Sequence, residues 1–504
     1  MMKKLTMLLL LVMVLLCSTV AHGQEQAEDI TPGTTIYGSG YDSFWFLTDK
    51  DMTGCWSGWN PSFTIESPTP IGSLYIMMDY NYGTYTVTDP ETGNSANVKQ
   101  NYLHQYVDLV TLLGYAPAKV ELSFISGHIG LCEMEIYGPG EPPAHVQRWQ
   151  EPWEGETDIL LFSAHGDDEQ LYFAGLLPLY AGQKRLNVQV VYMTDHRGET
   201  YLRTHEMLNG LWAVGVRAYP VFGWFADFIH YNMEQTYLIY EEEYDTTWAT
   251  LQGFVVEQLR RFKPQVAVGH DIYGEYGHGM HKVFTDLLIS AVPMINNPES
   301  FPKSAQRWGT WELPKLYLHL YWGRTLTMNY DLPLTAFNGM TAFEVSQKLG
   351  FPCHKTQQVE RFTTWFYGEN NEITRCDQIE LYNPAKYGLY HTLVGDDELK
   401  TDLMEHLTPH AYTRRRPLAE AALLALEPPP VIEPAVPFDP YVEDTEPTEV
   451  PTEPAASPAP TAPRHPLWID ITGNVLILAA AVTVLVVGSI KLKKSRSQCR
   501  PKAE

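Results

Sequence analysis

Hydrophobic and polar positions along the chain follow two different rhythms. Between residue 34 and about residue 140, short aromatic and β-branched runs alternate with turn residues. Runs such as "SLYIMMDY", "GTYTVTD" and "AKVELSFI" have the length of single strands, and their close spacing is typical of a β-sandwich. The pattern predicts an all-β sandwich over residues 30–145.

From residue 157 the rhythm changes to an alternation of strands and helices. Apolar runs predict strands at about 157–164, 187–194, 219–223 and 265–270. Longer amphipathic runs predict helices at about 169–182, 201–214, 246–262 and 280–291. Such alternation predicts an α/β region over residues 155–415, with a parallel sheet and helices on both of its faces.

The two ends of the chain carry targeting patterns. Residues 1–23 combine two lysines, a leucine-rich run and a small-residue cleavage site, which is the pattern of a secretory signal peptide. Residues 469–490 are long enough to span a bilayer and carry no charge from residue 475 on, and the basic tail 491–504 is the flank that stays cytoplasmic. The alternative, a buried core helix, leaves that basic flank unexplained. The proline-rich residues 427–466 predict an extended, disordered stalk. We therefore expect a single-pass cell-membrane protein whose main part is extracellular.

Composition narrows the classes of partner. The chain of 504 residues is long enough for two or more domains, and its formal net charge is −25. Nucleic-acid binding needs a basic face, so this charge argues against nucleic acid as a partner.

Four of the six cysteines remain between the predicted signal peptide and the predicted membrane span: Cys55, Cys132, Cys353 and Cys376. Disulfides persist in the compartment that this part of the chain would face. The boundary between the two regions favours the pairs Cys55–Cys132 and Cys353–Cys376, although four cysteines permit three connectivities.

One stretch, "ILLFSAHGDDEQLYFAG" (159–175), runs from a predicted buried strand directly into a histidine and three carboxylates. Crowding that much negative charge costs stability unless a cation or a helix terminus stabilises it. Asp167 or Asp168 fits the N-cap of the helix that follows, which is the purely structural interpretation. Together with His165, either carboxylate also fits a cation site.

Further polar residues follow the second and fourth predicted strands. Asp195 follows the second, and "GHDIYGEYGHGMH" (269–281) places His278 and His281 after the fourth. Because ligands of open α/β sheets collect at the carboxyl ends of the strands, we expect these groups to share one crevice. Imidazoles and carboxylate oxygen suit zinc, and three protein ligands leave a position for the water that a hydrolytic site needs. On its own, a His-x-x-His spacing is equally compatible with chance or a surface pair.

The order of these stretches resembles the PIG-L/LmbE family of zinc-dependent N-acetylglucosaminyl deacetylases. "AHGDDE" is similar to the family's first motif, Ala-His-Pro-Asp-Asp-Glu, and "YGHGMH" to its second histidine motif. Three more stretches match in order: "RGETYLRTHEM" (197–207), "CHKTQQ" (353–358) and "YGLYHTLVGDDELKTDLMEHL" (387–407). The resemblance covers about residues 157–410 and implies a Rossmann-like fold.

Carried over residue by residue, the resemblance implies that His165, Asp168 and His281 bind Zn²⁺. It implies that Asp167 is the general base, which takes a proton from the zinc-bound water. The charge of the metal would keep Asp168 ionised and make the crowded carboxylates tolerable.

The resemblance also implies roles around the reacting amide. His278 would stabilise the oxyanion and protonate the leaving amine, Tyr276 would assist the oxyanion, and Arg203 would contact substrate. Asp195 would contact a sugar hydroxyl or cap the next helix. By the same resemblance, His354 would contact the substrate or a residue that supports the metal ligands. Alternatively, it is a buried histidine whose hydrogen bonds are satisfied by other residues.

Two positions depart from the family pattern. Gly166 replaces the usual proline, which we expect to loosen the turn but to leave the ligands in place. Met280 stands where several members carry an aspartate that orients the histidine at position 278. Asp271 or Glu275 could replace that partner.

The front region resembles, more weakly, the discoidin or galactose-binding jelly-rolls. The matching stretches are "LTDKDMTGCWSGW" (47–59) and "CEMEIYGPG" (132–140). Four aromatic residues could stack on sugar rings or fill the sandwich core: Trp56, Trp59, Tyr80 and Tyr82.

Together these features predict a surface-anchored, zinc-dependent hydrolase that removes the N-acetyl group from a GlcNAc-type sugar or glycan. A de-N-acylase of a glycolipid or of a non-sugar amide is the first alternative. The second is a glycan-binding surface protein without catalytic activity.

Overall fold

The fold is seen in a computed structural model, which describes residues 26–125, 127–194, 201–357 and 373–413. The predicted signal peptide, stalk, membrane span and basic tail all lie outside these residues. Within them, no helix combines the length and the apolar character needed to cross a membrane.

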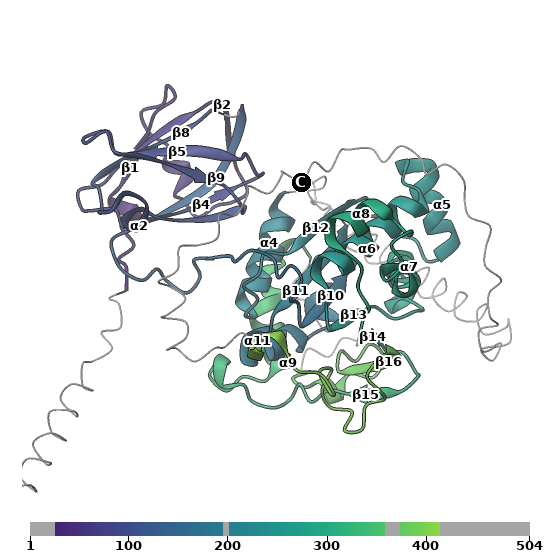
Figure 1. Ribbon diagram of the computed structural model, residues 1–504. Helices are drawn as coiled ribbons and strands as arrows, with labels where there is room; N and C mark the ends of the chain where they lie inside the picture. The colour runs from purple at the N-terminus through teal and green to yellow at the C-terminus, as the bar shows by residue number, and fades with distance from the viewer. Residues whose placement is uncertain (1–25, 126, 195–200, 358–372, 414–504) are drawn as a thin grey trace, which may run out of the picture. The chain divides into compact units, whose positions relative to one another are not determined.

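The front region consists of two antiparallel sheets with an apolar core between them (Figure 1). The five-stranded sheet has the order β1 (Thr35–Tyr37), β3 (Ser62–Glu66), β8 (Lys119–Phe124), β5 (Thr84–Thr88) and β6 (Ser95–Lys99). The four-stranded sheet has the order β2 (Trp56–Trp59), β9 (His128–Tyr137), β4 (Ser73–Met78) and β7 (His104–Asp108). Short helical segments lie between strands: η1 (Thr31–Gly33), η2 (Trp45–Leu47) and α2 (Leu109–Leu113). The predicted β-sandwich is confirmed.

Alternation of side chains explains why these segments form half-buried strands. In β3, Phe63 and Ile65 are fully buried, and in β5, Tyr85 and Val87 are buried while Thr86 between them is only half-buried. Since successive side chains of a strand point to opposite faces, one face of each strand enters the core and the other faces outward.

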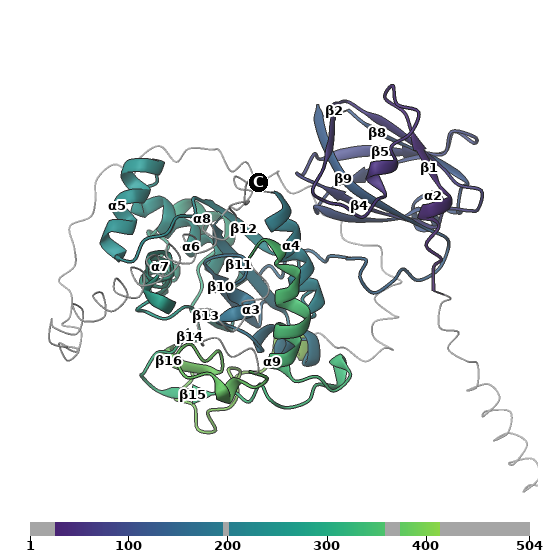
Figure 2. The same cartoon turned by 180° about the vertical axis from the view of Figure 1, so that it is seen from behind.

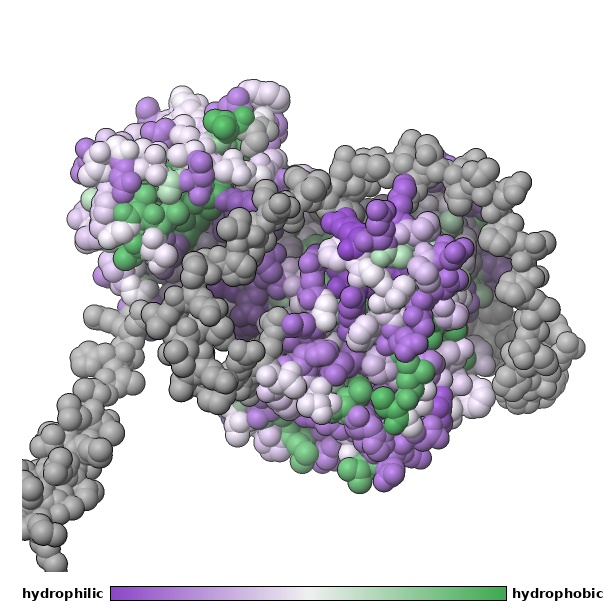
Figure 3. Space-filling view, in the orientation of Figure 1, coloured by the Kyte–Doolittle hydropathy of each residue, from purple (hydrophilic) through white to green (hydrophobic). Residues whose placement is uncertain are grey.

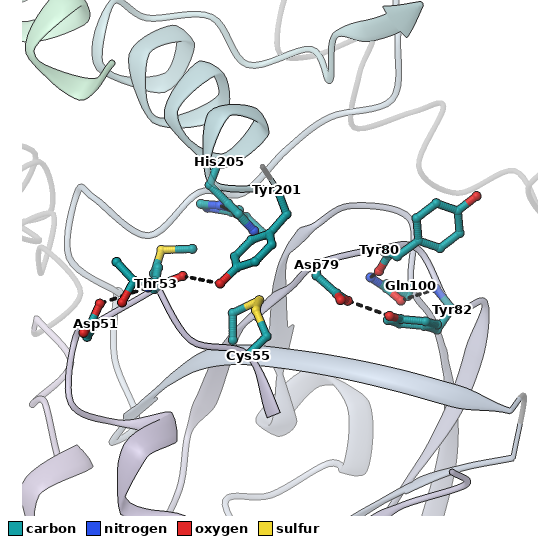
Figure 4. Close-up of a disulfide and its surroundings, with 12 residues drawn as sticks. Asp51, Thr53, Cys55, Asp79, Tyr80, Tyr82, Gln100, Tyr201 and His205 are labelled. Atoms are coloured by element: carbon teal, nitrogen blue, oxygen red, sulfur yellow. Dashed lines mark hydrogen bonds between the residues drawn. A yellow bond between two sulfur atoms is a disulfide. The ribbon is translucent and has the colours of Figure 1, made fainter. Parts of the chain in front are cut away.

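A disulfide joins Cys55, just before β2, to Cys132 on the paired strand β9, as the sequence predicts. Figure 4 shows this bond together with a neighbouring turn, in which the Tyr82 hydroxyl donates to Asp79 over 2.6 Å. The disulfide fixes the edge strand β2 to the centre of its sheet.

The four candidate aromatic residues of the sandwich divide into two pairs. Trp56 packs edge-on against Phe44 and Phe63, and Tyr82 also packs against the core. Trp59 is 74% exposed and Tyr80 is 47% exposed. The core interpretation therefore fits the first pair, and only Trp59 and Tyr80 keep the exposure that stacking on a sugar requires.

The second region is built on a seven-stranded sheet. Its order is β12 (Val221–Phe225), β11 (Val188–Thr194), β10 (Ile159–Ser163), β13 (Val266–Gly269), β14 (Lys315–His319), β16 (Lys386–Thr392) and β15 (Thr325–Thr327). The first five strands are parallel, and β16 is antiparallel to both of its neighbours. All residues of β10, β11, β13 and β14 are buried, because helices cover both faces of the sheet.

Helices α4 and α9 lie on one side of this sheet, and helices α5 to α8 lie on the other (Figures 1 and 2). The helices are α3 (Asp168–Leu171), α4 (Tyr201–Ala213), α5 (Met233–Tyr244), α6 (Trp248–Phe262), α7 (Gly279–Ile295), α8 (Pro302–Trp308), α9 (Ala342–Val345) and α11 (His410–Thr413). Shorter helical segments are η3 (Pro178–Gln183), η5 (Glu275–Gly277), η6 (Thr335–Phe337), η7 (Ser346–Gly350), η8 (Phe351–Cys353), η9 (Lys355–Gln357) and η11 (Cys376–Gln378).

The sheet separates two apolar cores. Side chains of β10 alternate between them: Ile159 and Leu161 pack with α4, whereas Leu160 and Phe162 pack with α6 and α7. Hydrophilic residues cover most of the face of this region seen in Figure 3, in keeping with the strongly acidic composition.

The four predicted strands and three of the four predicted helices are confirmed to within a few residues. The continuous helix expected over 169–182 is wrong. Helix α3 ends at Leu171, and Gly175 has a φ of +95°, which breaks the helix. A Cβ at Gly175 would come within 2.5 Å of the Tyr330 ring, so this close approach requires glycine.

The predicted Cys353–Cys376 disulfide is also wrong, because both cysteines are free. The Cys353 thiol, at the end of η8, donates to the Leu349 carbonyl over 3.3 Å. Cys376 is buried in η11 within the apolar core.

Candidate metal centre

The first histidine motif lies in the sharp connection between β10 and α3. Gly166 in this connection lies close to Met207 of α4, and a Cβ at position 166 would come within 2.4 Å of two atoms of the Met207 side chain. A proline, which carries a Cβ, would therefore displace Met207. The expectation that glycine merely loosens the turn is incomplete, since glycine also lets α4 approach the motif.

Three ligand-type atoms converge behind this turn. His165 Nδ1 lies 3.0 Å from Asp168 Oδ2 and 3.1 Å from Nε2 of His281, and the last two atoms are 3.3 Å apart. Tetrahedral zinc with bonds of about 2.0–2.1 Å places its ligand atoms roughly 3.3 Å from one another. The spacing of the three atoms thus fits three corners of a tetrahedral zinc site. All three side chains are buried.

Two neighbouring histidines could complete alternative sets of ligands, His278 and His270. His270 is already committed, since its Nε2 accepts the Ala164 N–H over 2.9 Å and its Nδ1 bonds to the Glu275 carboxylate. His278 is not, because its Nδ1 has no hydrogen-bond partner among the described residues. His270 is therefore the poorer candidate for a ligand, and His278 lies close enough to join His165 and His281.

The carboxylates around His165 and His281 favour positive charge at the place where the three ligand-type atoms meet. Burial lowers the pKa of His165, but the Asp227 and Asp168 carboxylates outweigh it and raise that pKa to about 10. Burial also lowers the pKa of His281, but the Asp168 carboxylate outweighs this effect and raises that pKa to about 9. Burial raises the pKa of Asp168, yet the two histidines hold it well below its usual range. One divalent cation could replace the two protons that these histidines take up.

Asp167 lies next to the ligand set and is half-buried. Burial and the Asp168 carboxylate raise its pKa to about 6. Although Asp167 precedes α3, its side chain makes no capping hydrogen bond to the helix. The structural interpretation as an N-cap is therefore wrong for Asp167, and its carboxylate stays available for proton transfer.

His278 and Tyr276 lie on the approach to the same atoms. The His278 ring centroid is 4.8 Å from that of His165, and burial, followed by repulsion from His165 and His281, lowers the pKa of His278 to about 2. The Tyr276 ring lies 5.3 Å from that of His278, and Tyr276 has a φ of +45°, a left-handed conformation that is strained for tyrosine.

The expected partner of His278 is not found. The Glu275 carboxylate bonds to the ring of His281 and not to that of His278, and the Asp271 carboxylate accepts the backbone N–H of Tyr273. Met280 is fully buried in the apolar core beside β10, so it supplies no polar group either.

Of the three residues predicted to contact substrate, one lies near the metal centre, one bonds to a buried glutamate, and one lies outside the described residues. Arg203 on α4 is 8% exposed, and its Nη1 lies 3.8 Å from Oδ2 of Asp227, the carboxylate beside His165. His354 is fully buried and its Nε2 bonds to Glu169 over 2.9 Å, which matches the alternative of a buried histidine with its own partner. Asp195 lies outside the described residues.

Sequence reasoning missed Asp227 and His319, and left the role of Glu275 open. Asp227 follows β12, and its Oδ1 lies 3.3 Å from His165 Nε2. His319 is the last residue of β14 and bonds to Glu275. The run "LYLH" (316–319) reads as a short strand that ends in a histidine, and it was the available signal for His319.

Comparisons with known proteins give structural neighbours only. No protein-family model and no curated protein matches the chain. An N,N'-diacetylchitobiose deacetylase from Pyrococcus horikoshii is similar at 14% identity, with a TM-score of 0.32, over 54% of this chain and 92% of that chain. A conserved protein from Thermus thermophilus is similar at 14% identity, with a TM-score of 0.30, over 44% and 91%. The 4-carboxy-2-hydroxymuconate hydratase GalB from a Pseudomonas strain is similar at 14% identity, with a TM-score of 0.30, over 48% and 99%. Similarity at this level assigns neither a family nor an activity to this chain.

Proposed function

We propose that this chain is a zinc-dependent hydrolase that removes the acetyl group from an N-acetylated sugar of the GlcNAc type. The observation that carries the proposal is the triangle of His165 Nδ1, Asp168 Oδ2 and His281 Nε2, with edges of 3.0–3.3 Å, beside the uncapped carboxylate of Asp167. The sugar class rests on the sequence resemblance of the two histidine motifs.

When bound, zinc supplies Lewis acidity and lowers the pKa of a water molecule. His165, Asp168 and His281 would hold it. The Asp167 carboxylate, with a pKa near 6, is ionised at neutral pH and accepts the proton of the attacking water. The same group then delivers that proton to the amine nitrogen as the C–N bond breaks, so that the proton count balances.

Of the two roles that the resemblance implies for His278, the proposal keeps only stabilisation of the oxyanion. Burial lowers the pKa of His278, so its imidazole is neutral at neutral pH and is a poor proton donor. A neutral imidazole still donates one hydrogen bond through its N–H, which stabilises negative charge on the carbonyl oxygen. Protonation of the leaving amine therefore falls to Asp167.

The placement of the enzyme is a further part of the proposal. The signal-peptide pattern of residues 1–23 and the apolar stretch 469–490 support a single-pass cell-membrane protein with an extracellular active site. Protease added to intact cells should then release an active soluble fragment by cutting within 427–466. Protection of the enzyme until the membrane is permeabilised would contradict the orientation.

The test of the function is acetate release from a panel of N-acetylated sugars and chitin oligomers, before and after zinc is removed with a chelator. We expect acetate release that stops on chelation and returns with zinc. Release only from glycolipids or non-sugar amides would support the first alternative. Glycan binding without any acetate release would support the second and overturn the proposal.

A further inference from the structure

One buried carboxylate joins three histidines behind the metal centre. Glu275, in η5, is fully buried. Its Oε2 lies 2.9 Å from His270 Nδ1 and 2.7 Å from His281 Nδ1, and its Oε1 lies 2.6 Å from His319 Nδ1. The backbone N–H of Asp271 adds a fourth bond to Oε1 over 3.2 Å. Residues from β13, α7 and β14 thus meet on a single side chain.

The hydrogen bonds of His270 show which of its ring nitrogens carries the proton. His270 Nε2 accepts the backbone N–H of Ala164, so this nitrogen has a lone pair, and Nδ1 carries the proton that Glu275 accepts. His270 therefore connects the β10–α3 turn to Glu275 through one hydrogen bond at each of its ring nitrogens.

The same argument places the proton on His281. Its Nδ1 faces the Glu275 oxygen and donates to it, so Nε2, which faces Asp168 and His165, is the nitrogen whose lone pair a metal would take in place of a proton. That lone pair is the one a metal ligand needs. Ligating histidines commonly donate their other ring N–H to a carboxylate, which fixes both the tautomer and the ring orientation.

His319 holds Glu275 from the far side. Its Nε2 bonds to the Asn383 carbonyl over 3.0 Å and its Nδ1 to Glu275, so both ring nitrogens face oxygen acceptors. Burial raises the pKa of Glu275, but His270 and the other hydrogen-bonded histidines hold it well below its usual range.

We propose that Glu275 is the positioning residue that makes His281 a zinc ligand, by holding the proton on Nδ1 and the ring in place. This proposal rests on the zinc site of the proposed function but not on the reaction. Glu275 acts through His281 and does not touch the reacting atoms. Met280, next to the ligand, contributes no carboxylate, so Glu275 is the acidic partner of this ligand.

The test is the zinc affinity of Glu275→Gln, measured by competition with a chelator and without substrate. In the native protein, ring nitrogens of three histidines face the two carboxylate oxygens of Glu275. Glutamine replaces one of these oxygens with an NH₂ donor, so at least one histidine ring must change its tautomer or turn away. We expect zinc to bind about 10- to 100-fold more weakly. Affinity within about threefold of the unaltered protein would overturn the proposal.

The matched control is Asp158→Asn. Asp158 is also buried and accepts hydrogen bonds from the backbone N–H groups of Asn187, His410 and Ala411, and among the described residues it bonds to no histidine ring. We expect this variant to lower the melting temperature and to leave zinc affinity unchanged. An equal loss of zinc affinity in both variants would assign the effect to general destabilisation and overturn the positioning role.

A measurement on the unaltered protein covers the case in which Glu275→Gln does not fold. With ¹¹³Cd in place of zinc and ¹⁵N-labelled histidine, we expect scalar coupling of the metal to Nε2 of His281 and a slowly exchanging proton on its Nδ1. Coupling to Nδ1 of His281 would overturn the proposal. Failure of the proposed function is seen separately, as a zinc-binding protein that releases no acetate.

Discussion

The sandwich and the α/β region each bury a glutamate, and the pKa values of the two carboxyl groups move in opposite directions. Glu133 on β9 is 2% exposed, and one of its oxygens has no hydrogen-bond partner among the described residues. Burial raises its pKa to about 7. Glu275 is buried at least as deeply, yet its three histidine partners hold its pKa well below the usual range. Burial alone therefore discharges a carboxyl group, whereas burial with donors keeps it ionised and able to orient a ligand.

The strands of the two regions also differ in how their side chains are buried. Strands β3 and β5 of the sandwich alternate between buried and half-buried residues, so polar side chains occur along their whole length. Strands β10, β13 and β14 are buried on both faces, and their histidines follow or occupy the carboxyl ends, while Lys315 begins β14 at the opposite edge. His165, His270 and His319 follow or end these three strands. In the α/β region, burial thus concentrates the chemistry at one edge of the sheet.

The largest effect should come from Asp167→Asn. An amide cannot accept the proton of the attacking water, so we expect turnover to fall by about two to four orders of magnitude. Zinc content should not change, since Asp167 is not among the three converging ligands. Steady-state acetate release and metal analysis on the same preparation check both parts. Near-normal turnover would show that another group activates the water.

Alanine substitutions along one strand of each region should sharpen the comparison of their strands. In β10, Leu160→Ala and Leu161→Ala should each cost about 2–5 kcal/mol of unfolding free energy, because both faces are buried. In β5, Val87→Ala should be costly, while Thr86→Ala should cost less than about 1 kcal/mol. Denaturant unfolding of the four variants measures this. A small loss of unfolding free energy in either Leu160→Ala or Leu161→Ala would contradict the burial of β10 on both of its faces.

Glu133→Gln should stabilise the sandwich in a pH-dependent way. The pKa of Glu133 is near 7 in the folded protein and is close to 4.5 when the chain is unfolded, so the folded state prefers the protonated form. Its contribution to stability is present below about pH 4.5 and is lost as the pH rises through 7. Relative to the native protein, the variant should gain up to about 3 kcal/mol at pH 8 and almost nothing at pH 4. A gain that does not depend on pH, measured with EDTA present, would show that charge is not its cause.

The smallest effect distinguishes two aspartates at helix starts. Asp108 accepts the backbone N–H of Thr111 over 3.0 Å and caps α2 in the sandwich, whereas Asp167 makes no such bond before α3. Asp108→Ala should therefore cost about 1 kcal/mol, and Asp167→Ala should not lower the melting temperature. Thermal unfolding of both variants is the measurement. Equal losses of stability would mean that Asp167 is a structural cap after all.

The candidate metal ligands were predicted from the resemblance of the two histidine motifs, and each is close in sequence to a strand end that the hydrophobic pattern also predicts. His165 and Asp168 follow β10, and His281 lies in the first turn of α7, after β13. The support behind them could not be predicted in the same way. His319 ends β14, a strand absent from the prediction, and Asp227 is brought to His165 only by the pairing of β12 with β11. The contact of Asp227 with His165 has no local signal in the sequence, whereas the run "LYLH" carried one for His319.

Two errors in the predicted fold have local causes that the sequence pattern does not express. The apolar period over 169–182 reads as one helix, but Gly175 adopts a positive φ against the Tyr330 ring. The predicted pairing of Cys353 with Cys376 rests on the boundary between the two regions, which takes no account of their positions in η8 and η11. In both cases tertiary packing decided between options that the sequence leaves open.

The central claim is that three named atoms hold one zinc ion, and anomalous diffraction at the zinc edge from zinc-loaded crystals tests it most directly. We predict a single peak about 2.0–2.2 Å from His165 Nδ1, Asp168 Oδ2 and His281 Nε2, with the fourth corner open to solvent. A peak bound to His270, or no peak at these three atoms, would contradict the account.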